Sequence, residues 1–175
     1  MKFQIRARFL PLLKLMTLSD NWQKAYTNLV DFIATHPAIT LDSTGVSIPS
    51  EVRDEFYRRF DDARRGFVED NYSVLPPELA ALSAHYMRLE KEVCNSLSLE
   101  GISLPIDLFT FLHSPTEGLM RALYNRLFDL LQSKISVELF DQAAVAEIQA
   151  SAADLLRLGY EMWMALSVVK ILDPE

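Results

Sequence analysis

Three histidines and one cysteine are the side chains of this chain best suited to bind a transition metal. Ligands that share one ion from a single helix lie three or four residues apart, as in Glu-x-x-His sites. None of His36, His85 and His113 has a histidine or cysteine at that spacing, and none follows a glutamate by three residues. The sequence therefore predicts no metal site and no cofactor.

Covalent catalysis needs a nucleophile beside a base, and the candidate pair is Cys94 with His85. The two residues lie about two and a half helical turns apart, on opposite faces of the expected helix. Cys94 is interpreted as a small buried apolar residue. The chain also lacks a Gly-x-Ser-x-Gly motif and a glycine-rich phosphate loop. We expect no catalytic residue, and an enzyme whose site combines residues far apart in the sequence stays open as a second alternative.

An arginine cluster between residues 53 and 65 could bind phosphates. The arginines are Arg53, Arg58, Arg59, Arg64 and Arg65. Acidic residues precede three of them by four positions, in the pairs Asp54–Arg58, Glu55–Arg59 and Asp61–Arg65. That order favours ion pairs within one helix. Because the chain also has a formal charge of −7, we expect a self-paired, solvated face and no nucleic-acid binding.

Methionine and aromatic side chains surround the last segment of the chain. Met162, Trp163 and Leu166 are the candidate interaction residues there. Such side chains form adaptable binding grooves, although a helix that is apolar on all sides is more often buried. A chaperone or carrier that shelters an apolar peptide or small ligand is therefore the first alternative function.

Residues 1–18 form a basic and apolar arm, in which Arg6, Arg8 and Phe9 are candidate interaction residues. The arm could bind an acidic partner or an anionic membrane surface, but we favour packing onto the acidic body of this same chain. A secretory signal is disfavoured because Lys14 interrupts the apolar run and no small-residue cleavage site follows.

Helices must position these residues, because apolar side chains recur with a period near 3.6 and prolines punctuate the chain. Helices are expected over residues 20–35, from Ser50 through Phe67, over 77–97 and 105–112, from Ser114, and over 142–172. A small hairpin is expected at residues 38–48 because Asp42 to Gly45 is a turn between β-prone residues. Residues 3–9 fit a strand or an amphipathic helix.

The last helix, over residues 142–172, would be about 46 Å long. We favour a central helix of a bundle, with part of a dimer interface as the alternative. Ala152 and Gly159 on its apolar stripe would let a neighbouring backbone approach closely, although Gly159 could instead mark a kink. A membrane span is disfavoured because Leu155–Leu172 contains Arg157, Glu161 and Lys170.

Together these patterns predict a mainly α fold, an irregular bundle of five to seven helices with a long C-terminal helix. A single domain is expected over residues 1–175, with the body at 19–172. The expected function is a non-catalytic protein-interaction domain that binds a protein partner or a second copy through the C-terminal helix. A further hypothesis is that the chain is one domain of a larger protein. The single cysteine gives no internal disulfide, so we expect a reducing, cytoplasmic location.

Overall fold

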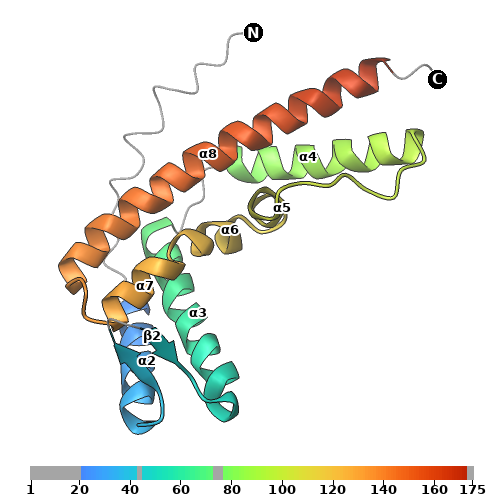
Figure 1. Cartoon of the computed structure of the whole chain (residues 1–175). Helices are drawn as coiled ribbons and strands as arrows, with labels where there is room; N and C mark the ends of the chain where they lie inside the picture. The colour runs from blue at the N-terminus through green and yellow to red at the C-terminus, as the bar shows by residue number, and fades with distance from the viewer. Residues whose placement is uncertain (1–20, 43–44, 73–76, 173–175) are drawn as a thin grey trace. The chain divides into compact units, whose positions relative to one another are not determined.

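The computed structural model describes residues 21–42, 45–72 and 77–172, which form seven α-helices and one antiparallel hairpin (Figure 1). Their order is α2 (Asn21–Thr35), β1 (Thr40–Asp42), β2 (Gly45–Ser47), α3 (Ser50–Tyr72), α4 (Pro77–Ser96), α5 (Ile106–His113), α6 (Pro115–Ala122), α7 (Tyr124–Leu131) and α8 (Val137–Leu172). The mainly α fold, its long C-terminal helix and its small hairpin are confirmed. The predictions for residues 1–18, including strand or helix at 3–9, lie outside the described residues.

Backbone contacts divide the chain into two compact units. The described part of the first unit contains α2, the hairpin, α3 and the second half of α7. The second unit contains α4, α5, α6, the start of α7, and α8. The single domain stays a prediction.

The first unit has an aromatic core between two antiparallel helices. Trp22 at the start of α2 meets α3 near its end, where a Cβ on Gly66 would lie 3.0 Å from Trp22 Cα. The Trp22 ring packs edge-on against Phe67 with ring centroids 5.4 Å apart. About two turns earlier in α3, the ring centroid of Phe60 lies 4.5 Å from that of Phe128 on α7. The predicted apolar stripe of this segment is therefore the buried face of α3.

The first turn of α2 is capped from another helix. The Trp22 backbone N–H donates a 2.8 Å hydrogen bond to Oδ2 of Asp70, a buried carboxylate on α3. A carboxylate suits this position because the first N–H groups of a helix lack partners within the helix. The sequence spacing suggests Asp20 as the cap, and Asp20 lies outside the described residues.

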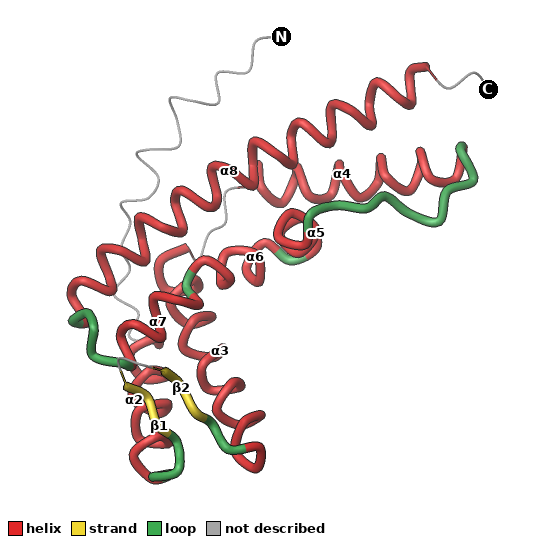
Figure 2. Tube along the Cα trace, in the orientation of Figure 1, coloured by secondary structure: helices red, strands yellow, loops and turns green. Residues whose placement is uncertain are grey.

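The hairpin pairs Thr40 with Ser47 and Asp42 with Gly45, within the predicted range of residues 38–48 (Figure 2). Its turn is held by Gln132, just after α7. The Gln132 Nε2 donates hydrogen bonds to the carbonyl oxygens of Asp42 at 2.7 Å and Gly45 at 3.3 Å. A two-stranded hairpin is marginal alone, so these bonds help to fix it.

In the second unit, α4 and α8 run parallel and side by side (Figure 1). Near their ends, Glu92 forms an ion pair with Lys170. Further back, side-chain carbons of Leu82 on α4 and Leu112 on α5 lie 3.4 Å from where a Cβ on Gly159 would be, which is ordinary van der Waals contact. The nearest atoms are side-chain atoms, so the close backbone approach predicted at Gly159 is not found, and α8 continues through it as one helix.

The long helix α8 packs against α4, α5 and α6, as a central helix would. It has 36 residues, which corresponds to about 54 Å. It begins at Val137, earlier than the expected start at 142, because Ser136 caps it: the Leu139 N–H donates to Ser136 Oγ at 3.3 Å.

The connection between α4 and α8 contains three short helices. Ser114 and Pro115 mark the start of α6 as predicted, although the Ser114 side chain makes no capping hydrogen bond. The helix α7 was not predicted. It is separated from α6 by Leu123 alone, a residue with near-helical backbone angles, so no proline or glycine marks the break.

Candidate interaction surface

Two of the three histidines lie at the C-terminal ends of helices. The Nδ1 atom of His36 lies 2.7 Å from the Phe32 carbonyl oxygen, and that of His113 lies 2.9 Å from the Phe109 carbonyl oxygen. Each imidazole also packs against the phenylalanine ring one turn earlier, with centroids 4.2 and 4.0 Å apart. Since a carbonyl oxygen can only accept, each ring nitrogen donates to the C-terminal turn of its helix, which gives both residues a structural role.

The two other residues considered for metal binding or covalent catalysis lie on α4. His85 is exposed and Cys94 is half-buried. Within residues 21–42, 45–72 and 77–172, no group of three or more His, Cys, Asp or Glu side chains is arranged to hold a metal ion. In the same ranges, none of the helices has the length and apolar character needed to cross a membrane.

Two arginines of α3 form ion pairs with acidic residues of the same helix. Arg58 bonds both Glu55, at 2.6 Å, and Asp62, at 3.0 Å, while Arg59 bonds Glu55 at 2.7 Å. The hydrogen bonds from Arg58 are the main reason that the pKa of Glu55 falls to about 2. The predicted Glu55–Arg59 pair is confirmed. Arg58 bonds Glu55 and Asp62, whereas the sequence spacing predicts Asp54 as its partner.

The candidate interaction residues predicted from the sequence lie in three different environments. Arg6, Arg8 and Phe9 lie outside the described residues. Leu166 is only 6% exposed and belongs to the buried side of α8, and Met162 and Trp163 are half-buried at its margins. The side of α8 that is open to solvent therefore carries other residues.

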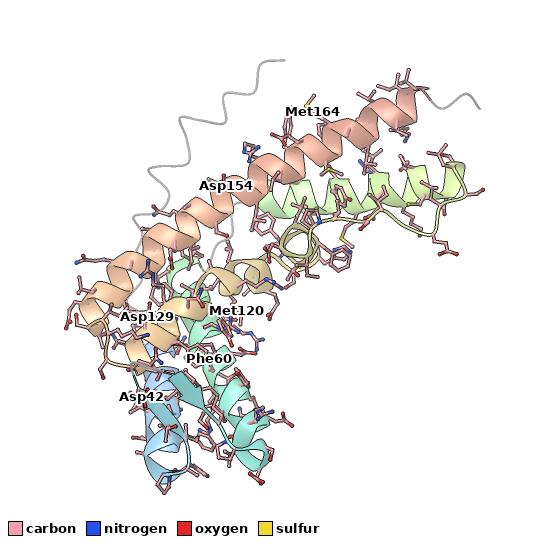
Figure 3. All side chains as sticks on the ribbon, in the orientation of Figure 1. Asp42, Phe60, Met120, Asp129, Asp154 and Met164 are labelled. Carbon is pink, nitrogen blue, oxygen red and sulfur yellow. The ribbon has the colours of Figure 1, made fainter. Side chains whose placement is uncertain are left out.

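A continuous line of exposed residues follows the open side of α8, and we call it the outer stripe. It consists of Leu139, Gln142, Ala146, Ala150, Ala153, Arg157, Tyr160, Met164, Val168 and Ile171. Successive members lie three or four residues apart, so all ten share one helical face. Figure 3 shows Met164 and Asp154 on the side of α8 that points away from α4.

The outer stripe is unusually apolar for an exposed helix face. The exposed fraction of the side chain is 41% for Tyr160, 47% for Met164, 51% for Val168 and 81% for Ile171. The open side of a solvated helix normally carries charged and polar residues. Only Gln142 and Arg157 in this stripe are polar, and Arg157 forms a 2.9 Å ion pair with Glu161.

The sequence contained a signal for the outer stripe. The predicted apolar stripe through Ile148, Leu155 and Leu166 is the buried side of α8. The apolar residues on the opposite side, Met164 and Val168 among them, are then left without a neighbour in the bundle. Because the helix is apolar on both sides, its pattern alone did not show which side is buried.

Elsewhere the described surface offers smaller features. On α5, Ile106 is 61% exposed. A concavity on α2 is open to solvent, and the described residues that line it, Gln23, Lys24, Thr27 and Asn28, are polar. No protein-family model, no curated protein and no solved structure matches the chain.

Proposed function

We propose that the chain is a non-catalytic protein-interaction domain and that the outer stripe of α8 is its docking surface. The observation that carries this proposal is the exposure of Tyr160, Met164, Val168 and Ile171 along one face. Fully burying one such side chain is worth about 1.5–3 kcal/mol. Because these residues are already partly covered, a partner would gain roughly half of that at each, which is enough for association when several are covered together.

The residue types of the outer stripe also suit an interface. Tyrosine, methionine and arginine are enriched in protein interfaces, whereas lysine, glutamate and alanine are depleted. The stripe contains Tyr160, Met164 and Arg157 and has neither lysine nor glutamate, and its three alanines are the exception to this pattern. A ridge of this kind along a straight helix fits a partner helix or a groove between helices. The compartment that we propose is the cytoplasm, on the argument from the single cysteine.

The proposal is tested with a photo-crosslinking residue placed at Met164, inside the outer stripe, or at Ile106, an exposed apolar control on α5. We expect cells that make the first protein to give a defined adduct that the control lacks, identified by mass spectrometry. The identified protein is then purified and its dissociation constant measured. Met164→Glu should weaken binding at least about tenfold, which is about 1.4 kcal/mol, and Ile106→Glu should leave it unchanged.

Two results would overturn the docking role. One is the absence of any adduct at Met164 that Ile106 does not also give. The other is an identified partner whose affinity is the same for wild type and Met164→Glu. A second copy of the chain counts as a partner in this test.

A further inference from the structure

We infer that the partner of the outer stripe is a second copy of this chain, with the two α8 helices antiparallel and a two-fold axis level with residue 155. This inference rests on the proposed function. Three features of α8 carry it: the sizes of the stripe residues, the charges at its centre, and its length.

Residue size changes along the outer stripe. Before Arg157 the stripe contains the small residues Ala146, Ala150 and Ala153. After Arg157 it contains the large residues Tyr160 and Met164. In a parallel pair, alanine would face alanine at one end and large side chains would face each other at the other end, so the helices could not stay at one separation. An antiparallel pair places Tyr160 and Met164 opposite the small residues Ala150 and Ala146, which permits even packing over the middle of the stripe.

The register follows from the same positions. When residue 155 of each copy lies at the axis, Ala150 is level with Tyr160 of the second copy, and Ala146 is level with Met164. The outer members also fall level with one another, Leu139 with Ile171 and Gln142 with Val168. The whole stripe thus meets itself, as a self-complementary two-fold interface requires.

The centre of this arrangement brings opposite charges together. Arg157 lies level with Ala153 of the second copy and one position from its Asp154. The small alanine leaves room for the arginine stem, and each arginine lies near an aspartate of the other copy. Arg157 and its present partner Glu161 are 59% and 56% exposed, so the guanidinium is free to turn toward Asp154 of the second copy. Such exposed pairs fix orientation more than they add affinity.

The length of the stripe sets the strength of the dimer. From Leu139 to Ile171 it extends about 48 Å, at 1.5 Å per residue. A helix face about 10 Å wide and of this length buries on the order of 1,000 Å² in total on both copies, which is the lower limit for a specific interface. We therefore expect a reversible dimer with a dissociation constant of about 1–100 µM.

Sedimentation equilibrium of the full chain tests the pairing. The monomer mass is 20.0 kDa, and the weight-average mass should rise toward twice that value between about 1 and about 100 µM protein. Met164→Glu should leave the protein monomeric over that range, since it places a charge opposite Ala146. Ile106→Glu, an equal change at an exposed apolar residue of α5, should dimerise like wild type.

Cysteine cross-linking tests the direction, in a Cys94→Ser background with oxidised glutathione as the oxidant. A disulfide requires Cα atoms about 4.4–6.8 Å apart. Ala150→Cys should not form a covalent dimer with itself, because its two copies would lie about 15 Å apart along the axis. Mixed with Tyr160→Cys, it should form the mixed disulfide. Self-linked Ala150→Cys dimers would indicate a parallel pair and overturn the inference.

A strictly monomeric wild type would also overturn the inference. If the crosslinker at Met164 then captures a different protein that binds through the outer stripe, the docking role stands and only the second copy is excluded. If Met164 gives no specific adduct and the chain is monomeric, both proposals fail.

Discussion

At the scale of single residues, the contact between α5 and α6 leaves no room for a side chain on Gly118. A Cβ there would lie 2.7 Å from Phe111 Cα, which is backbone and cannot move alone. We expect Gly118→Ala to destabilise the fold by about 1–3 kcal/mol, in spite of the gain of up to about 1 kcal/mol in helix propensity. Urea unfolding followed by circular dichroism measures the change.

Gly101→Ala is the matched control, because the space around Gly101 is open for at least 4 Å. Its effect should stay within about 0.5 kcal/mol. Equal stability of Gly118→Ala and wild type would show that the helices separate more easily than the contact indicates.

The ion pairs of Glu55 predict a pH dependence. In the folded chain the pKa of Glu55 is lowered from 4.5 to about 2, first by the hydrogen bonds from Arg58. Because the folded pKa lies below the unfolded value, ionised Glu55 stabilises the fold at pH above about 4.5, and this contribution is lost as the pH falls toward about 2. Glu55→Gln should therefore show a smaller loss of stability between pH 4.5 and pH 2 than wild type.

Chemical unfolding at several pH values across this window makes the comparison. Asp54→Asn removes the same charge from the neighbouring exposed position and keeps both bonds of Glu55 to Arg58 and Arg59. Its pH profile should stay closer to that of wild type. If the pH profiles of Glu55→Gln and Asp54→Asn are identical, the change in pH dependence comes from the lost negative charge and not from the ion pairs of Glu55. The expected difference is small, since exposed ion pairs contribute little.

At the scale of elements, the hairpin depends on Gln132. Its side chain amide bonds the carbonyl oxygens on both sides of the turn, at Asp42 and Gly45. Gln132→Ala removes these two bonds and should cost about 1 kcal/mol. Amide hydrogen exchange in residues 40–47 should become at least about fivefold faster, which corresponds to the same energy.

Gln149→Ala is the control for this prediction, since Gln149 is an exposed glutamine on α8. It should leave exchange in the hairpin unchanged. If Gln132→Ala also leaves the exchange unchanged, the hairpin is held by its own strands and by the apolar contacts beneath it, of which Ile39 is a buried member.

Most elements could be predicted because local signals and tertiary packing agree. Proline at the start of α6 and the apolar period of α3 are visible without any knowledge of neighbours, and both helices lie where these signals place them. The start of α7 has no such signal, because the chain bends at Leu123 through a small change of backbone angles. Only packing against the rest of the molecule determines a bend of that kind.

The outer stripe shows the same limit. A helix such as α8, with apolar residues all around, is predicted with ease, but its orientation depends on which neighbours cover it. Leu166 and Met164 are two residues apart and equally apolar, yet Leu166 is 6% exposed and Met164 is 47% exposed. The side chains of Leu82 and Leu112, which meet α8 at Gly159, decide which side is buried.

At the scale of the whole molecule, the charge of −7 acts against the proposed dimer, because two acidic copies repel each other. The screening length falls from about 30 Å at 0.01 M salt to about 8 Å at 0.15 M. We therefore expect the dimer to become several-fold tighter over this range, as measured by sedimentation equilibrium. A dimer that weakens with added salt would instead be driven by opposite charges, such as the basic residues 1–18 on an acidic surface.

Both units join segments that are far apart in the chain, and this has a consequence for their synthesis. Gln132 lies 90 residues after Asp42, and Lys170 lies 78 residues after Glu92. A ribosome that adds about 5–20 residues per second needs about 4–18 s to produce the missing half of either contact. During that time the side of α3 around Phe60 lacks its contact with Phe128, and the side of α4 around Leu82 lacks its contact with α8. We therefore expect the nascent chain to be a client of chaperones that act during translation.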